Sequence, residues 1–81
     1  MIQVIVTPKA IKDLRKIPQR EQKKIQSKLA ILKEDKFCGK KLTRDLKNYY
    51  ALRAWPYRIV YEIIKGEVWV VKVQHRQGVY K

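Results

Sequence analysis

Two apolar runs in the second half of the chain, PYRIVYEII and EVWVVKVQH, are separated only by Lys65-Gly66. Each run is rich in β-branched and aromatic residues that alternate with polar ones, which is typical of a β-strand. A glycine supplies the positive φ that a two-residue turn needs, so these runs predict a tight antiparallel hairpin. This hairpin constrains the fold most, because the helical part of the chain must pack its apolar side against it.

Two further segments also have the pattern of strands. MIQVIV, at the start of the chain, has Ile2, Val4 and Val6 alternating with Gln3 and Ile5, and YYALRAW precedes the hairpin. A turn around Gly39 and the basic linker KKLTRDLKN lead into the second of these segments. Together with the hairpin, YYALRAW predicts a three-stranded antiparallel meander.

The segment between the first strand and the meander predicts two helices. Thr7 is the expected N-cap of the first helix and Pro8 its first residue. Pro18 should end this helix and lie in the first turn of the next one. The second helix has one apolar stripe at helical spacing, made of Ile25, Leu29 and Leu32. We therefore predict a single α+β domain over residues 1–81, with both helices packed on one face of an antiparallel sheet.

The charge of the chain indicates its partners. Lys and Arg number 20 against seven Asp and Glu, giving a formal net charge of +13 over 81 residues. Such an excess attracts polyanions through counterion release, or an acidic protein. One cysteine and one histidine make a zinc site improbable, and we expect no metal and no cofactor. The N-terminus lacks the pattern of a signal peptide and no apolar run is long enough to span a bilayer, so we expect a cytoplasmic protein with no membrane partner.

Polar residues gather where the strands of the predicted hairpin end. A two-residue loop pairs Ile64 with Glu67, which puts Arg58 opposite Val73 and His75 two residues further along on the same face. A slip by one residue would reverse these faces. The residues expected at this end of the sheet are Arg53, Arg58, His75, Arg76 and Tyr80.

These residue types suit the cleavage of RNA without a metal. The 2′-OH must lose a proton and attack the adjacent 3′ phosphate, and the leaving 5′ oxygen must gain a proton. Histidine titrates near neutrality and is suited to either proton transfer. Arginine matches the negative charge of the phosphorane with fixed planar donors. Tyrosine can stack on an unpaired base, as proteins commonly do with single-stranded RNA.

The second half of the chain resembles RelE-type toxins of prokaryotic toxin–antitoxin modules. These commonly read YR-aliphatic-aliphatic-YE followed by an apolar strand that ends HR-x-x-VY, and PYRIVYEI and VKVQHRQGVY are similar to both motifs. The first strand and TPKAIKDLRKI also fit, so the resemblance extends over nearly the whole chain. It implies the RelE-like microbial ribonuclease fold and a ribosome-dependent mRNA interferase that inhibits translation. It also implies an acidic cognate antitoxin as partner, with mRNA on the ribosome as substrate.

The resemblance also assigns roles to individual residues. Arg58 matches the arginine of YR and Arg76 that of HR, which bind phosphate and stabilise the transition state. Tyr80 matches the tyrosine of VY, which orients or stacks the substrate base, and His75 matches an acid–base position. Substrate-binding basic residues of the preceding strand are matched by Arg53 and Lys47. The chain departs from the family in having Trp55-Pro56 and Gln74 where glycine usually precedes these motifs.

Two other functions remain open at this point. A ParE-type toxin has the same fold but poisons DNA gyrase through protein contact and has no nuclease activity, and fold does not distinguish it from an interferase. A basic RNA-binding module also accounts for the charge of +13, but it leaves the arginine, histidine and tyrosine motifs unexplained.

Overall fold

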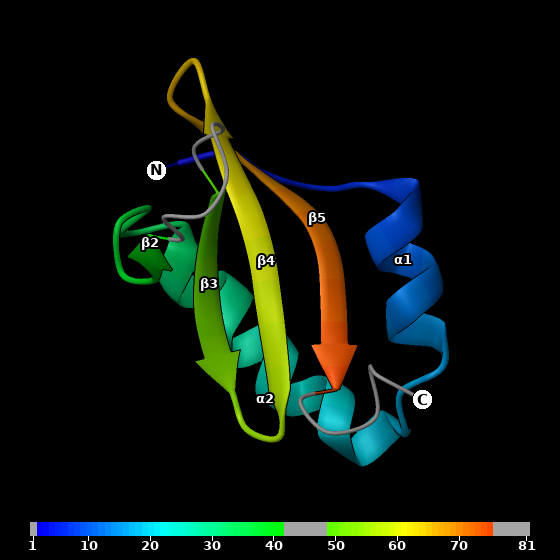
Figure 1. Cartoon of the computed structure of the whole chain (residues 1–81). Helices are drawn as coiled ribbons and strands as arrows, with labels where there is room; N and C mark the ends of the chain where they lie inside the picture. The colour runs from blue at the N-terminus through cyan, green and yellow to red at the C-terminus, as the bar shows by residue number, and fades with distance from the viewer. Residues whose placement is uncertain (1, 42–48, 76–81) are drawn as a thin grey trace.

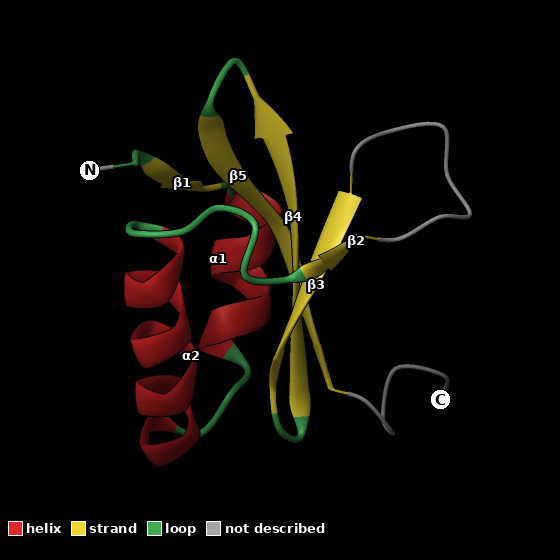
Figure 2. Cartoon of the chain, turned by 90° about the vertical axis from the view of Figure 1, so that its left-hand side faces the viewer, coloured by secondary structure: helices red, strands yellow, loops and turns green. Residues whose placement is uncertain are grey.

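The computed structural model describes residues 2–41 and 49–75, which form two helices and a five-stranded sheet. Both helices lie on one side of the sheet, as Figure 2 shows, and the predicted α+β class is confirmed. In chain order the elements are β1 (Val4–Val6), α1 (Pro8–Arg15), α2 (Gln19–Leu32), β2 (Lys40–Lys41), β3 (Tyr49–Ala54), β4 (Tyr57–Ile64) and β5 (Glu67–His75).

The sheet has the strand order β1-β5-β4-β3-β2 and is mixed (Figure 1). The strands β3, β4 and β5 form the predicted antiparallel meander, whereas β1 joins its edge parallel to β5. The strand β2 lies within the predicted linker and pairs antiparallel with β3, so the linker prediction is wrong for Lys40–Lys41. The remainder of that linker, residues 42–48, lies outside the described residues.

The local signals for helix ends hold in the structure. Thr7 caps α1, because its Oγ1 accepts a hydrogen bond from the amide of Ala10 at 3.4 Å. Pro8 is the first residue of α1, and Pro18 lies between the helices as the N-cap of α2, one position before the predicted first turn. The side chain of Gln22 donates to the carbonyls of Leu14 and Ile17, both at 2.8 Å, and so joins the two helices.

The core lies between the helices and the sheet. The predicted stripe of α2 points into it, with Ile25 and Leu32 fully buried and Leu29 packed at its border. From the sheet, Ile59 and Tyr61 of β4 are fully buried. In Figure 1, α2 crosses behind β3 and β4 while α1 lies beside β5. Neither helix is long and apolar enough to cross a membrane in the described part of the chain.

The turn between β4 and β5 is the predicted two-residue hairpin. Lys65 has φ 51° and Gly66 has φ 83°, the pair of positive values that a type I′ turn requires. Ile64 pairs with Glu67, as expected from this loop length. The hairpin register near the turn is therefore confirmed.

Candidate functional site

A β-bulge in β5 changes the predicted register in the part of the hairpin that bears the candidate site. Tyr61 pairs with Val70 but Val60 pairs with Lys72, which leaves Val71 as an extra residue in β5. Arg58 therefore lies opposite Gln74, and the prediction that it faces Val73 is wrong. Beyond the bulge every β5 side chain is on the face opposite to the one the uninterrupted alternation predicted.

The bulge is held by the start of α1. The hydroxyl of Thr7 donates to the carbonyl of Val70 at 2.8 Å, and the Thr7 amide donates to the same oxygen at 3.1 Å. Three residues along, the Val73 amide donates to Oδ2 of Asp13 at 3.0 Å. The Val73 amide lies beyond the end of β1, which pairs only with Val68–Val70, so the carboxylate of Asp13 serves as its acceptor.

Arg53 and Arg58 lie directly opposite each other across β3 and β4. Their strand neighbours Ala54 and Tyr57 are buried against the helices, so the two arginines point to the helix-free face of the sheet. Arg53 is exposed and Arg58 is half-buried. We call this pair, with its neighbour Gln74 across β5, the arginine face.

Two like charges directly opposite each other on a sheet repel and cost stability, by about 0.2–1 kcal/mol. Within residues 2–41 and 49–75, neither Arg53 nor Arg58 forms an ion pair with a carboxylate. The ion pairs in these ranges join Lys9 to Asp13 and Lys24 to Glu21, both on helices. The arginine face is therefore suited to receive an anion that bridges its two guanidinium groups.

His75 lies on the other face of the sheet. It pairs with Tyr57, and the two rings meet edge to face with centroids 5.2 Å apart and an interplanar angle of 89°. Both rings line a groove of about 620 Å³ between α1 and the end of β5, which also includes Lys9, Asp13 and Lys16. His75 and Arg58 consequently do not share a face, contrary to the register prediction.

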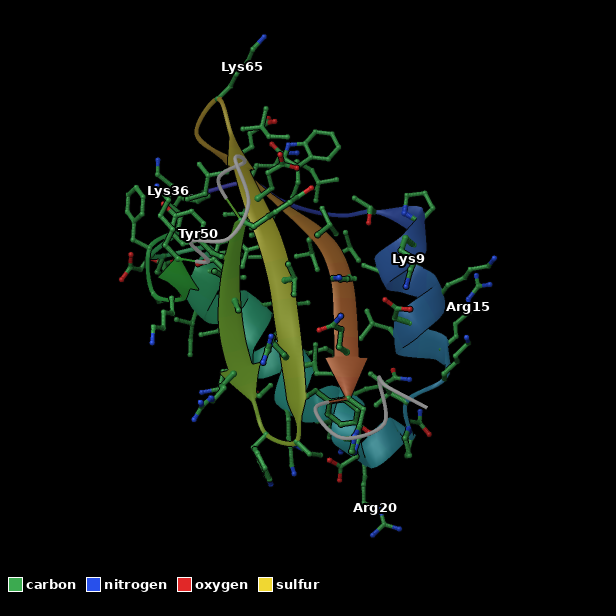
Figure 3. The ribbon with its side chains drawn as sticks, viewed as in Figure 1. Lys9, Arg15, Arg20, Lys36, Tyr50 and Lys65 are labelled. Carbon is green, nitrogen blue, oxygen red and sulfur yellow. The ribbon has the colours of Figure 1, made fainter. Side chains whose placement is uncertain are left out.

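Three predicted site residues, Lys47, Arg76 and Tyr80, lie outside the described residues. The structure thus brings together Arg53 and Arg58, and separates His75 from them. In the described ranges no three side chains of His, Cys, Asp or Glu gather to hold a metal ion. Figure 3 shows other cations at the periphery, where Arg15, Arg20 and Lys65 point away from the body of the domain.

Two side chains that can ionise have pKa values moved away from neutrality. Burial raises the pKa of the Cys38 thiol, and the nearby Asp35 raises it further, so the thiol stays protonated and is a poor nucleophile. Burial also raises the pKa of Tyr61 to about 12. Its hydroxyl donates to the carbonyl of Lys36 at 2.8 Å and accepts from the amide of Gly39 at 3.1 Å, which is a structural role.

Sequence reasoning missed Trp55 as a neighbour of the arginine face. It lies in the two-residue connection between β3 and β4, its side chain is 56% exposed, and its peptide bond to Pro56 is cis. With Arg53, Tyr57 and Arg58 it lines a small hollow of about 50 Å³. The available signal was its place in the sequence, directly before PYR at the end of a predicted strand.

The fold is similar to that of solved toxins. The isolated E. coli RelE toxin is 27% identical, with a TM-score of 0.77 over 99% of this chain and 92% of that chain. The toxin–antitoxin complex RelBE2 from Mycobacterium tuberculosis contains a chain 29% identical, with a TM-score of 0.75 over 93% of this chain and 98% of that one. YoeB from Staphylococcus aureus is 21% identical and shows a likeness of fold, with a TM-score of 0.72 over 90% and 94% of the two chains.

The sequence comparison gives the family. No curated protein matches the sequence. Residues 4–80 match the family model described as the ParE toxin of type II toxin–antitoxin system, parDE. Since this match spans nearly the whole chain, the protein belongs to the ParE toxin family and is a type II toxin of the RelE/ParE superfamily.

Proposed function

We propose that this toxin is a metal-independent, ribosome-dependent mRNA endoribonuclease that inhibits translation. The observation that carries the proposal is the pairing of Arg53 with Arg58 on the helix-free face, where no described carboxylate neutralises either charge. An RNA phosphate suits two arginines at paired positions because each guanidinium presents planar, fixed donors to its oxygens. Similarity to the E. coli and M. tuberculosis RelE-type chains also supports the proposed endoribonuclease function.

In the proposed reaction, the 2′-OH of one nucleotide loses its proton and attacks the adjacent phosphorus. The bond to the 5′ oxygen of the next nucleotide breaks, and that oxygen takes up a proton. Arg58 and Arg76 match the negative charge that accumulates on the phosphorane. Arg53 and Lys47 hold the neighbouring strand, and Tyr80 stacks on a base.

His75 is the proposed acid–base residue, and its role needs a separate test because it lies on the helix side of the sheet against Tyr57. A His75→Gln variant removes the titratable group and keeps a polar side chain. If His75 transfers a proton, this variant should cleave slowly and lose one limb of the bell-shaped pH–rate profile. An unchanged pH profile would remove His75 from the reaction.

The test of the main proposal is cleavage of a translated mRNA by purified toxin and ribosomes, with the new 5′ ends mapped. Arg58→Ala should lower the cleavage rate by about 100-fold or more, because lost charge stabilisation in a transition state is worth about 3–4 kcal/mol. Arg58→Lys keeps the charge but loses the planar guanidinium group. Its cleavage rate should lie between that of the wild type and that of Arg58→Ala. The matched control is Arg20→Ala, which removes the same charge from an exposed position on α2.

Two further variants probe residues outside the described ranges. Arg76→Ala should abolish cleavage and toxicity with the fold intact, because the change removes a charge that stabilises the phosphorane. Tyr80→Ala should weaken cleavage through the lost stacking, which is worth about 1–3 kcal/mol per base. Growth arrest by both variants at wild-type strength would show that RNA cleavage is not the mechanism.

Inhibition of DNA gyrase by protein contact is the second candidate. The specific observation in its favour is the family match, because the model is that of the ParE toxin. Supercoiling by purified gyrase in the presence of the toxin distinguishes the two. Inhibited supercoiling with intact mRNA would establish the gyrase reading, whereas cut mRNA with normal supercoiling would establish the interferase.

We also propose an acidic antitoxin as the partner that keeps the toxin inactive. The RelE chains of E. coli and M. tuberculosis were crystallised in toxin–antitoxin complexes. In this chain the stretch from Lys9 to Lys41 has twelve basic and four acidic residues, which favours an acidic segment that folds upon the toxin. Apolar anchors should set the lifetime of the complex, and charge should set its rate of formation.

A further inference from the structure

Trp55 extends the arginine face at the end of the β3–β4 hairpin. The connection between the strands consists of Trp55 and Pro56. In the sequence, Trp55 is two residues from Arg53 and three from Arg58. Its side chain is 56% exposed. A single exposed aromatic residue is ordinary on a protein surface, and its surroundings decide whether it has a role.

The other aromatic side chains near the surface have different neighbours. Phe37, 61% exposed, meets the ring of Tyr50 edge-on with centroids 6.1 Å apart. Trp69, near the opposite end of the β4–β5 hairpin, donates its indole N–H to Glu67 at 3.3 Å. Trp55 differs from both because its hollow is lined by two arginines.

The size of this hollow indicates what it can hold. About 50 Å³ is room for one or two water-sized groups, such as an oxygen of a phosphate, and is too small for a nucleobase. A base whose phosphate sits between Arg53 and Arg58 therefore lies outside the hollow, where the indole of Trp55, 56% exposed, offers it an aromatic surface. An aromatic face beside cations is how proteins hold single-stranded RNA.

The connection that carries Trp55 is anchored on both sides. Ala54 before it is 2% exposed and Tyr57 after it is 9% exposed, so both ends are fixed in the core. From α2, Nζ of Lys24 donates to the Trp55 carbonyl at 3.5 Å. An indole on a fixed backbone has few rotatable bonds to immobilise, which keeps the entropic cost of stacking low.

We propose that Trp55 is a stacking platform for an unpaired base of the RNA strand whose phosphate is bound by Arg53 and Arg58. This assignment rests on the proposed nuclease function and adds a substrate-binding residue to it.

The test uses fluorescence of Trp55 in a Trp69→Phe variant, which leaves one tryptophan. The probe is a 2′-O-methyl RNA tetranucleotide, which cannot be cleaved because its 2′ oxygen is blocked. Stacking should quench the emission of Trp55. A tetranucleotide of the same charge without its two central bases should bind through its phosphates and leave the emission unchanged.

Affinity for the tetranucleotide gives the second readout. Trp55→Ala should weaken binding about 5- to 150-fold, since stacking one base is worth about 1–3 kcal/mol and each 1.4 kcal/mol is a factor of ten. Trp55→Phe keeps an aromatic face and should recover most of that loss. Trp69→Phe is the matched control and should bind like the wild type.

The outcomes separate this inference from the nuclease proposal. Wild-type affinity in Trp55→Ala, or equal quenching by the strand without central bases, would overturn the platform even if the toxin cleaves mRNA. Quenching and lost affinity without cleavage of ribosome-bound mRNA would retain the platform and reject the nuclease. A Trp55→Ala variant that loses only antitoxin or gyrase binding would show that the indole is a protein contact, which also overturns the inference.

Discussion

Removing the hydroxyl of Tyr61 should destabilise the domain without changing its shape. Tyr61 is fully buried, its ring stacks on Tyr50 with centroids 5.4 Å apart, and its hydroxyl makes two hydrogen bonds to the segment that leads from α2 to β2. Tyr61→Phe keeps the ring and removes both bonds. A hydrogen bond contributes about 1 kcal/mol net, and more if its partner is left buried.

The expected loss is therefore about 2 kcal/mol. Lys36 and Gly39, whose backbone groups lose their partner, are half-exposed, so water can replace part of the lost bonding and the full penalty for two buried groups does not apply. For a domain of this size, 2 kcal/mol lowers the melting temperature by about 8–16 °C. Gly39 should also lose protection of its amide against hydrogen exchange.

Urea denaturation of both proteins measures the difference in the free energy of unfolding. The matched control is Tyr50→Phe, which removes a hydroxyl from the neighbouring ring and keeps the stack, and it should stay within about 0.5 kcal/mol of the wild type. The slope with urea should not change, because the same surface is exposed on unfolding. A Tyr61→Phe variant no less stable than Tyr50→Phe would refute the reasoning.

The pH dependence of this difference gives an independent check. Burial raises the pKa of Tyr61 from 10.0 to about 12, so the folded state holds the phenolic proton more tightly than the unfolded state. This contribution to stability is complete below pH 10 and is lost as the pH rises from there towards 12. Between pH 8 and pH 11 the wild type should lose on the order of 1 kcal/mol relative to Tyr61→Phe. A constant difference over this range would contradict the buried, protonated hydroxyl.

Three further predictions concern other parts of the domain. Gly39→Ala should cost about 1–3 kcal/mol in the same urea assay, because its new Cβ would lie 2.7 Å from the Tyr61 hydroxyl. Asp13→Ala should cost about 1.5–3 kcal/mol, since its carboxylate accepts from the Val73 amide, whereas the exposed Glu34→Ala should cost at most about 0.5 kcal/mol. Raising the salt concentration should markedly lower the rate constant for association with the antitoxin and change the dissociation rate constant far less. Stopped-flow mixing measures the first and dilution of the complex the second. An association rate that does not depend on salt would mean that the positive charge serves another polyanion.

The sequence predicts those elements whose signals are local. Thr7-Pro8 and Pro18 mark helix ends through their own backbone chemistry, and the glycine of Lys65-Gly66 identifies the hairpin turn. By contrast, β2 has no local signal, because Lys40–Lys41 carries no apolar alternation and is a strand only through its pairing with β3.

The bulge could not be predicted for a related reason. Around Val71 the strand reads VWVV, four apolar residues in succession, so either phase of the alternation fits the sequence. In the structure the register shifts next to the place where Thr7 donates to the Val70 carbonyl, a contact between residues 63 positions apart. For the same reason the sequence does not predict whether His75 and Arg58 share a face of the sheet, because their relative position depends on the one extra residue in β5.

The parallel pairing of β1 with β5 fixes the order in which the domain can be completed during synthesis. Val4 pairs with Val68, which is made 68 − 4 = 64 residues later. At about 5–20 residues per second, the first strand waits about 3–13 s for its partner. Until then β4 lacks the strand that pairs with it from Tyr57 to Ile64, so the sheet that carries Arg53 and Arg58 is incomplete. A nascent toxin therefore completes its sheet only after β5 has been made.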